Sequence, residues 1–130
     1  VDPDDKDIQN KDIKTLIQLK GQDKYLRLNE SNRLEMVPAS QLDDKCYWLI
    51  GSAGRQNRSF MNNNNTKPLY LDINNETYSF SDTEVILRYG NLQNNIYFSI
   101  GNKDDYWLRY DEATNSFTTF YDKKLNEIEQ

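Results

Sequence analysis

The reactive side chains of this 130-residue chain offer little that could catalyse a reaction. The sequence contains no histidine and a single cysteine, Cys46. It therefore excludes a Ser-His-Asp or Cys-His catalytic arrangement, a histidine-ligated zinc site and an intramolecular disulfide. Asp43-Asp44 and Asp104-Asp105 are adjacent carboxylate pairs. A glycosidase needs carboxyls that face each other across a cleft, whereas neighbours in sequence point to different sides. We interpret both pairs as solvated loop residues and expect no enzymatic activity.

Cofactors and several partner classes are also disfavoured. Asn102, Asp104 and Asp105 lack the glycine and distal glutamate of a calcium-binding loop, and the five glycines form no phosphate-binding loop. The net charge is −5 and no basic tail is present, which disfavours nucleic-acid binding. No segment approaches the roughly 20 apolar residues that span a bilayer. The sequence therefore predicts no cofactor, no metal, no nucleic-acid partner and no membrane span.

The patterning of the chain predicts β-strands. Apolar residues alternate with polar ones in short runs rich in aromatic and β-branched residues, and Asn, Asp and Gly separate these runs. No window carries a sustained helical stripe. Residues 1–14 are highly charged and poor in large apolar groups, so we predict a charged flexible tail there. Cys46 lies inside an apolar strand, and we interpret it as a buried, inert thiol. Residues 15–130 then form a single domain.

An internal repeat organises that domain. Aromatic-leucine pairs recur at Tyr25-Leu26, Tyr70-Leu71 and Trp107-Leu108. Each pair follows an apolar strand with a polar turn and precedes two further strands; the closing strands are predicted at 46–50, 85–88 and 125–128. The spacing from Trp48 to Phe60 equals that from Ile86 to Phe98, at 12 positions. The sequence therefore predicts three units of four short strands.

Three four-stranded units predict an all-β fold, a β-trefoil in which a six-stranded barrel is capped by three hairpins. The predicted core layers are Leu26, Leu71 and Leu108; Trp48, Ile86 and Leu125; and Ile17, Phe60 and Phe98. Burial of Leu108 would expose Trp107 and Arg109 at least partly, next to Tyr106 and Tyr110. Trp107 is then either a binding residue or a cover over the barrel mouth, and we favour the cover.

The stretch Lys24-Tyr25-Leu26 … Lys45-Cys46-Tyr47-Trp48 resembles the ricin-type β-trefoil lectins, in particular the small trefoil components of clostridial haemagglutinin complexes. The Gln-x-Trp signature that closes each unit in that family is incomplete here. Its positions read Cys46-Tyr47-Trp48, Glu84-Val85-Ile86 and Lys123-Lys124-Leu125. The resemblance implies a secreted or extracellular, non-catalytic domain that recognises a carbohydrate or glycoprotein at a shallow surface site.

The resemblance also implies which residues would bind the sugar. The position of the family's sugar-binding carboxylate is occupied by Arg27, Asp72 and Arg109 in the three units, so Asp72 alone keeps that chemistry. The implied site is Asp72, Asn74, Asn75 and Glu84, with Tyr78 as the stacking ring. Asp72 can equally be a solvated strand residue. The alternative function is a protein-binding trefoil, either a protease inhibitor or a subunit of a secreted toxin or adhesin assembly.

Overall fold

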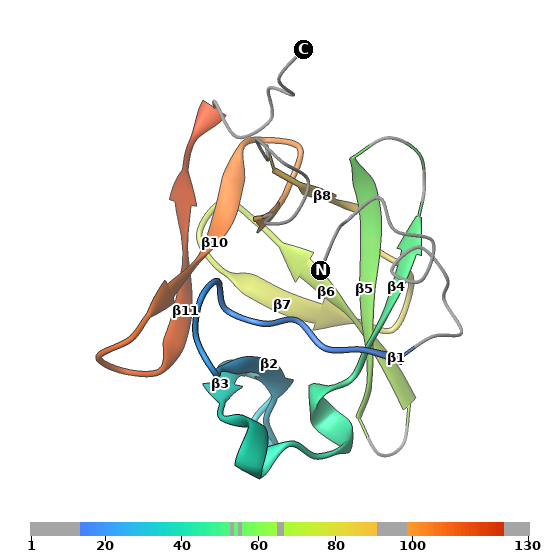
Figure 1. Ribbon diagram of the computed structural model, residues 1–130. Helices are drawn as coiled ribbons and strands as arrows, with labels where there is room; N and C mark the ends of the chain where they lie inside the picture. Colours follow the sequence, from blue (N-terminus) through green and yellow to red (C-terminus); the bar gives the residue numbers. More distant parts are fainter. Residues whose placement is uncertain (1–13, 53, 55, 65–66, 91–98, 124–130) are drawn as a thin grey trace.

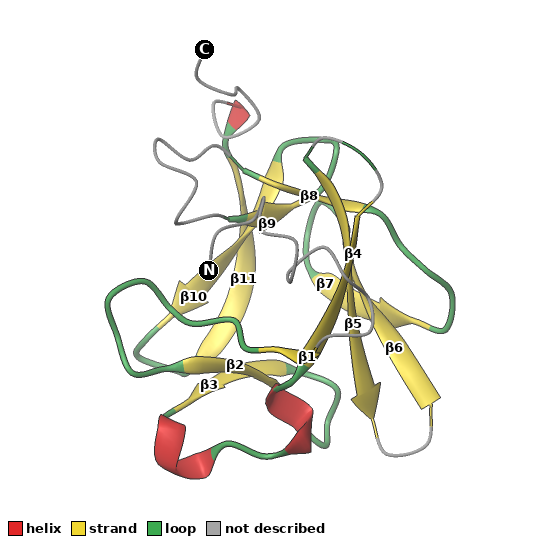
Figure 2. Cartoon of the chain, turned by 45° about the vertical axis from the view of Figure 1, so that its right-hand side comes forward, coloured by secondary structure: helices red, strands yellow, loops and turns green. Residues whose placement is uncertain are grey.

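The chain folds as an all-β protein, as the alternating pattern predicts. The computed structural model describes residues 14–52, 54, 56–64, 67–90 and 99–123 (Figure 1). The strands of these residues are β1 (Lys14–Thr15), β2 (Tyr25–Leu28), β3 (Leu34–Val37), β4 (Trp48–Ser52), β5 (Asn57–Asn64), β6 (Lys67–Ile73), β7 (Tyr78–Ser81), β8 (Leu87–Tyr89), β9 (Ile100–Gly101), β10 (Tyr106–Asp111) and β11 (Ser116–Tyr121). Two short 3-10 helices, η1 (Ala39–Gln41) and η2 (Asp44–Cys46), connect β3 to β4 beside the β2–β3 ribbon (Figure 2).

Every strand pairing is antiparallel. One sheet has the order β1-β4-β5-β8-β9-β10-β11, with β6 paired to β5 and β7 paired to β6, while β2 and β3 form a separate ribbon. Three hairpins, β2–β3, β6–β7 and β10–β11, therefore alternate along the chain with the strands between them (Figure 1). The described strands do not close into a barrel. The predicted strand at 125–128 and most of the predicted tail lie outside the described residues, and Lys14, at the end of that tail, pairs with Leu49.

The three predicted aromatic-leucine pairs occupy corresponding places in the sheet. Each aromatic residue pairs with the preceding strand segment, and the three pairs are Gln18 with Tyr25, Met61 with Tyr70 and Gly101 with Trp107. Each of these strands then continues into a hairpin of the same kind. These pairs define which residues correspond between the three units.

The core is formed mainly by the predicted residues. Fully or almost fully buried are Leu26, Trp48, Phe60 and Leu71, while Ile17 and Leu108 are partly buried against them. The prediction for Ile86 is wrong, because β8 begins at Leu87, two residues later than expected. Leu87 takes the buried position, while Ile86 lies before the strand and is only half-buried. Phe98 and Leu125 lie outside the described residues, and Ile100 fills the core position in β9.

In β10 the expected partial exposure of Trp107 is wrong as well, whereas Leu108 packs against the core and Arg109 is exposed as expected. Trp107 is fully buried, which agrees with the favoured interpretation as a cover, while Leu108 is half-buried and Arg109 exposed. The cause is the glycine opposite. A Cβ on Gly101 would overlap the Trp107 ring and lie 2.7 Å from the Tyr106 carbonyl oxygen, so only glycine leaves room for the indole. Trp107 Nε1 donates to the Asp122 carbonyl oxygen at 2.9 Å.

Cys46 is buried, as predicted, but it ends the 3-10 helix η2 and does not lie in a strand, because β4 begins at Trp48. Burial raises the pKa of its thiol, and its Sγ lies 3.6 Å from Asp43 Oδ1. A protonated, buried thiol is a poor nucleophile, in line with an inert cysteine. The part of the chain that the structure describes holds no helix of the length and apolarity that a membrane crossing requires.

Candidate functional site

An open hollow lies between two turns that are distant in sequence. One wall is the β6–β7 turn and the other is the turn that joins β9 to β10. The hollow has a volume of about 580 Å³ and is lined by Ile73, Asn74, Asn75, Glu76, Asn102, Lys103 and Asp104. Six of the seven lining residues are polar or charged.

The first wall is shaped by Asn74. Its side-chain Oδ1 accepts hydrogen bonds from the backbone N–H groups of Glu76 at 2.8 Å and Thr77 at 2.7 Å. Its own backbone N–H donates to the Thr77 carbonyl oxygen at 2.9 Å. Asparagine favours such turns because its short side chain replaces a backbone acceptor. The turn therefore holds Asn75 and Glu76 at an exposed tip.

The second wall is held by the buried amide of Asn102. Its Oδ1 accepts from the backbone N–H groups of Asp104 at 2.9 Å and Tyr106 at 3.0 Å. Its Nδ2 donates across the hollow to the Ile73 carbonyl oxygen at 3.0 Å and to Asn75 Oδ1 at 3.4 Å. Asn102 thus fixes its own turn and ties it to the β6–β7 turn. The hollow is consequently preorganised before any ligand enters.

Several polar groups of the lining are left for a ligand. Glu76, Lys103 and Asp104 are exposed, and their side chains make no hydrogen bond or ion pair within residues 14–123 as described. Together with the side-chain amides of Asn74 and Asn75 they present both donors and acceptors. The described residues contain no cluster of three or more His, Cys, Asp or Glu that could hold a metal ion. The hollow therefore offers both hydrogen-bond donors and acceptors to a polar ligand.

Two of the five predicted site residues, Asn74 and Asn75, line this hollow. Asp72 does not line it. It lies two residues before Asn74, half-buried in β6 and opposite Ser79. Asp72 is therefore close to the hollow along the strand but does not form part of its wall.

Tyr78, the predicted stacking ring, does not line this hollow. Tyr78 is buried in the core, and its hydroxyl accepts a hydrogen bond from the backbone N–H of Leu34 at 2.9 Å. Its ring packs edge-on against Phe80, with the ring centres 6.1 Å apart. Tyr78 therefore joins the second hairpin to the first and presents no free face to a sugar.

Glu84 is also separate from the hollow. It lies in the connection from β7 to β8, at the end of β7 opposite to the β6–β7 turn (Figure 1). Its Oε2 accepts a hydrogen bond from Ser59 Oγ at 2.9 Å. The structure thus brings together Asn74 and Asn75 and separates Tyr78 and Glu84 from them.

In the first unit, the residue that corresponds to Asp72 is Arg27, and its side chain is held by two ion pairs. Arg27 Nη2 contacts Asp43 Oδ2 and its Nη1 contacts Glu35 Oε2, each at 2.8 Å. These contacts raise the pKa of Arg27 and hold the pKa of Asp43 below its usual value. The third counterpart, Arg109, is exposed opposite Thr118. Asp72 is consequently the one carboxylate among the three corresponding positions.

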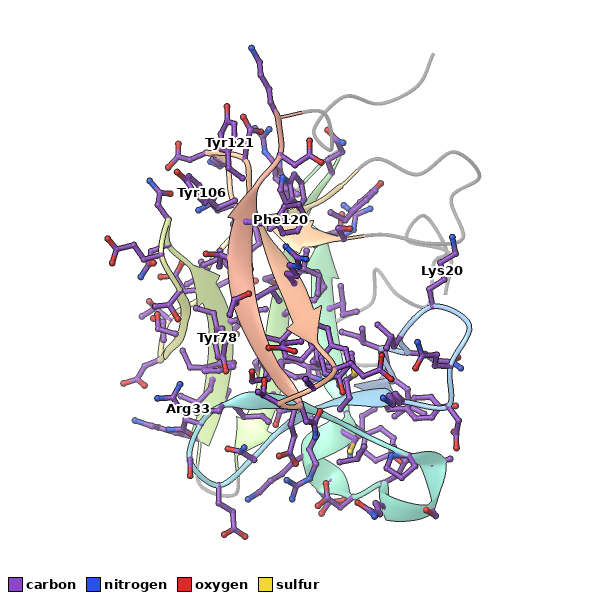
Figure 3. All side chains as sticks on the ribbon, turned by 90° about the vertical axis from the view of Figure 1, so that its left-hand side faces the viewer. Lys20, Arg33, Tyr78, Tyr106, Phe120 and Tyr121 are labelled. Carbon is purple, nitrogen blue, oxygen red and sulfur yellow. The ribbon has the colours of Figure 1, made fainter. Side chains whose placement is uncertain are left out.

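Sequence reasoning missed an exposed aromatic residue beside the hollow. Tyr121 is 59% exposed and is the one large hydrophobic side chain exposed in the described part of the chain. Its ring packs edge-on against Tyr106, with the ring centres 5.5 Å apart, at one end of the β10–β11 hairpin (Figure 3). The next residue, Asp122, donates its N–H to the Asp105 carbonyl oxygen at 2.9 Å. Tyr121 is therefore tied to the turn that forms the second wall.

Comparisons of the chain with protein-family models, curated proteins and solved structures found no significant match. A function for this protein therefore rests on the geometry of its own site.

Proposed function

We propose that the chain is a β-trefoil. The order β1-β4-β5-β8-β9 follows the chain, and a hairpin is inserted after β1, β5 and β9. This is the order that five strands of a six-stranded trefoil barrel would have. The sixth strand of such a barrel would be the one predicted at 125–128. Closing the sheet in this way would remove two exposed strand edges.

We further propose that the protein is a non-catalytic, secreted or extracellular carbohydrate-binding domain. The hollow between the β6–β7 turn and the β9–β10 turn carries this proposal. Its walls are preorganised by Asn102, while the side chains of Asn75, Glu76 and Asp104 stay exposed to solvent. Amides and carboxylates pair with vicinal hydroxyls through charge-assisted and neutral hydrogen bonds. The site is shallow and open, so we expect millimolar to micromolar affinity for a single sugar unit.

A glycan array followed by titration calorimetry tests this proposal. Asn75→Ala removes one amide from the tip of the hollow and should weaken binding of a captured sugar about tenfold, since a lost hydrogen bond in a site costs about 1–1.5 kcal/mol. Glu30→Ala changes the corresponding tip of the β2–β3 turn and should leave the affinity unchanged. Asp72→Ala tests the role that the family resemblance implies. If the array captures no sugar at millimolar concentration, the carbohydrate proposal is wrong.

A protein-binding trefoil is the second candidate, and Tyr121 favours it. An exposed tyrosine supported by a second ring is typical of a binding hot spot in a protein interface. In this case the protein would act as an inhibitor or as a subunit of a secreted toxin or adhesin assembly. A partner retained on the immobilised chain, and lost with Tyr121→Ala but retained with Asn75→Ala, would favour this candidate.

A further inference from the structure

The tips of the three corresponding hairpins differ in charge. Each turn begins with Asn29, Asn74 or Asp111, and the side-chain oxygen of that residue accepts a backbone N–H of its own turn in all three cases. The following residue is Glu30 in the first hairpin and Glu112 in the third, whereas the second hairpin has the neutral Asn75.

Both glutamates have a lysine close by. Lys45 Nζ lies 4.0 Å from Glu30 Oε1, and Lys24 Nζ lies 3.5 Å from Glu112 Oε1. Lys24 also lies over the Tyr110 ring, 5.4 Å from its centre. Lys24 therefore contacts the tip of the third hairpin, at the junction that corresponds to the hollow.

The second hairpin has a different neighbour at that junction. The residue before the aromatic-leucine pair of the first unit is Lys24, which reaches the tip of the third hairpin. The corresponding residue of the third unit is Tyr106, so no lysine reaches the tip of the second hairpin from this position. Lys103 is the one basic residue of the lining, and Glu76 and Asp104 oppose it. The hollow thus combines an open shape with an excess of one negative charge, in a chain of net charge −5.

We infer that the hollow selects sugars by charge: it takes neutral and amino sugars and rejects acidic sugars. This inference rests on the proposed carbohydrate-binding function. A unit charge at contact distance in water is worth about 1 kcal/mol, which corresponds to about a fivefold change in affinity. The expected order of affinity is amino sugar, then neutral sugar, then uronic acid, with about fivefold between neighbours at low salt. Salt screens exposed charges, so the differences should shrink as ionic strength rises.

Titration calorimetry on the full chain with matched sugars tests the inference. Two hexose series are used, gluco and galacto, each as the methyl glycoside, the 2-amino-2-deoxy sugar and the uronic acid. The members of a series share a ring and differ in charge, so the ratio of their dissociation constants reports the electrostatics of the site. The double variant Glu76→Gln and Asp104→Asn leaves Lys103 as the one charged residue of the lining. The dissociation constant of the uronic acid divided by that of the methyl glycoside should therefore fall below one.

Asp82→Asn is the matched control. Asp82 is exposed, pairs with Lys67 at 3.1 Å and lies in the β7–β8 connection, away from the hollow. Its substitution also makes the net charge of the protein less negative. The control should leave the ratio unchanged. Tightest binding of the uronic acid, or a ratio that Asp82→Asn alters as much as the double variant does, overturns the charge selectivity and leaves carbohydrate binding intact. If none of the six sugars binds, the proposed function and this inference both fail.

Discussion

The contact between Gly101 and Trp107 can be tested directly by a single substitution. A Cβ at residue 101 would overlap the indole and come within 2.7 Å of the Tyr106 carbonyl oxygen. Trp107 is fully buried and held by its bond to the Asp122 carbonyl oxygen, so it has nowhere to move. Overpacking costs about 1–3 kcal/mol, and loss of the indole hydrogen bond adds about 1 kcal/mol. We therefore expect Gly101→Ala to lower the free energy of unfolding by about 2–4 kcal/mol.

Urea denaturation followed by circular dichroism measures this loss. With an m value of about 2 kcal/mol/M, the midpoint should fall by about 1–2 M. Gly21→Ala is the control: its φ is +73° and no atom lies within 4 Å of the added Cβ, so it should cost only about 1 kcal/mol of backbone strain.

A second variant tests the cause. The other two units carry tyrosine at the place of Trp107, opposite Gln18 and Met61. Trp107→Tyr should therefore lessen the cost of Gly101→Ala in the double variant, giving a coupling of about 1 kcal/mol or more. A cost below about 0.5 kcal/mol for Gly101→Ala, or strictly additive effects, would refute the reasoning.

Three further substitutions report on the contacts that build the domain. Asn102→Ala should lower the free energy of unfolding by about 2–4 kcal/mol, because it leaves buried backbone groups without their hydrogen-bond partner. A loss near zero, as expected for an exposed residue, would contradict this. Arg27 holds the pKa of Asp43 below its ordinary value of 3.8, so the ionised Asp43 side chain stabilises the folded state. This stabilisation is present above pH 3.8 and is lost as the pH falls below it. The unfolding free energy of Asp43→Asn should accordingly fall less than that of the wild type between about pH 5 and about pH 3. Tyr78→Phe should cost about 1–3 kcal/mol, speed hydrogen exchange at the Leu34 amide and spare sugar binding; unchanged stability and unchanged exchange at that amide would contradict a role for the Tyr78 hydroxyl in joining the two hairpins.

The strands of this protein could be predicted from sequence because local alternation specifies them. The hairpins around Tyr25-Leu26 and Tyr70-Leu71 lie where the pattern placed them, with the leucines inside. The correspondence between the units was also readable, since it depends on spacing along the chain. The expectation that failed, the partial exposure of Trp107, depends on the residue that faces it on the neighbouring strand. Burial of Trp107 follows from Gly101, which alternation within β10 does not reveal.

The candidate site was only partly predictable for a similar reason. Asn74 and Asn75 carry a local signal, because asparagine at a turn between two strands is visible in the sequence. The second wall is not visible in this way. Asn102 reaches the Ile73 carbonyl oxygen across 29 positions of chain, and this contact exists only in the folded sheet. Tyr78 was misplaced because its hydroxyl finds a buried partner in another hairpin.

Backbone amide shifts during a sugar titration test the central claim most directly. A ¹⁵N-labelled sample of the full chain is titrated with the tightest-binding neutral sugar of the array. We predict that the largest shifts cluster in the two turns, at residues 74–76 and 102–104, and that Asn75→Ala reduces them. Shifts centred on Tyr121 or on the β7–β8 connection, with the two turns unmoved, would contradict the assignment of this hollow as the carbohydrate site.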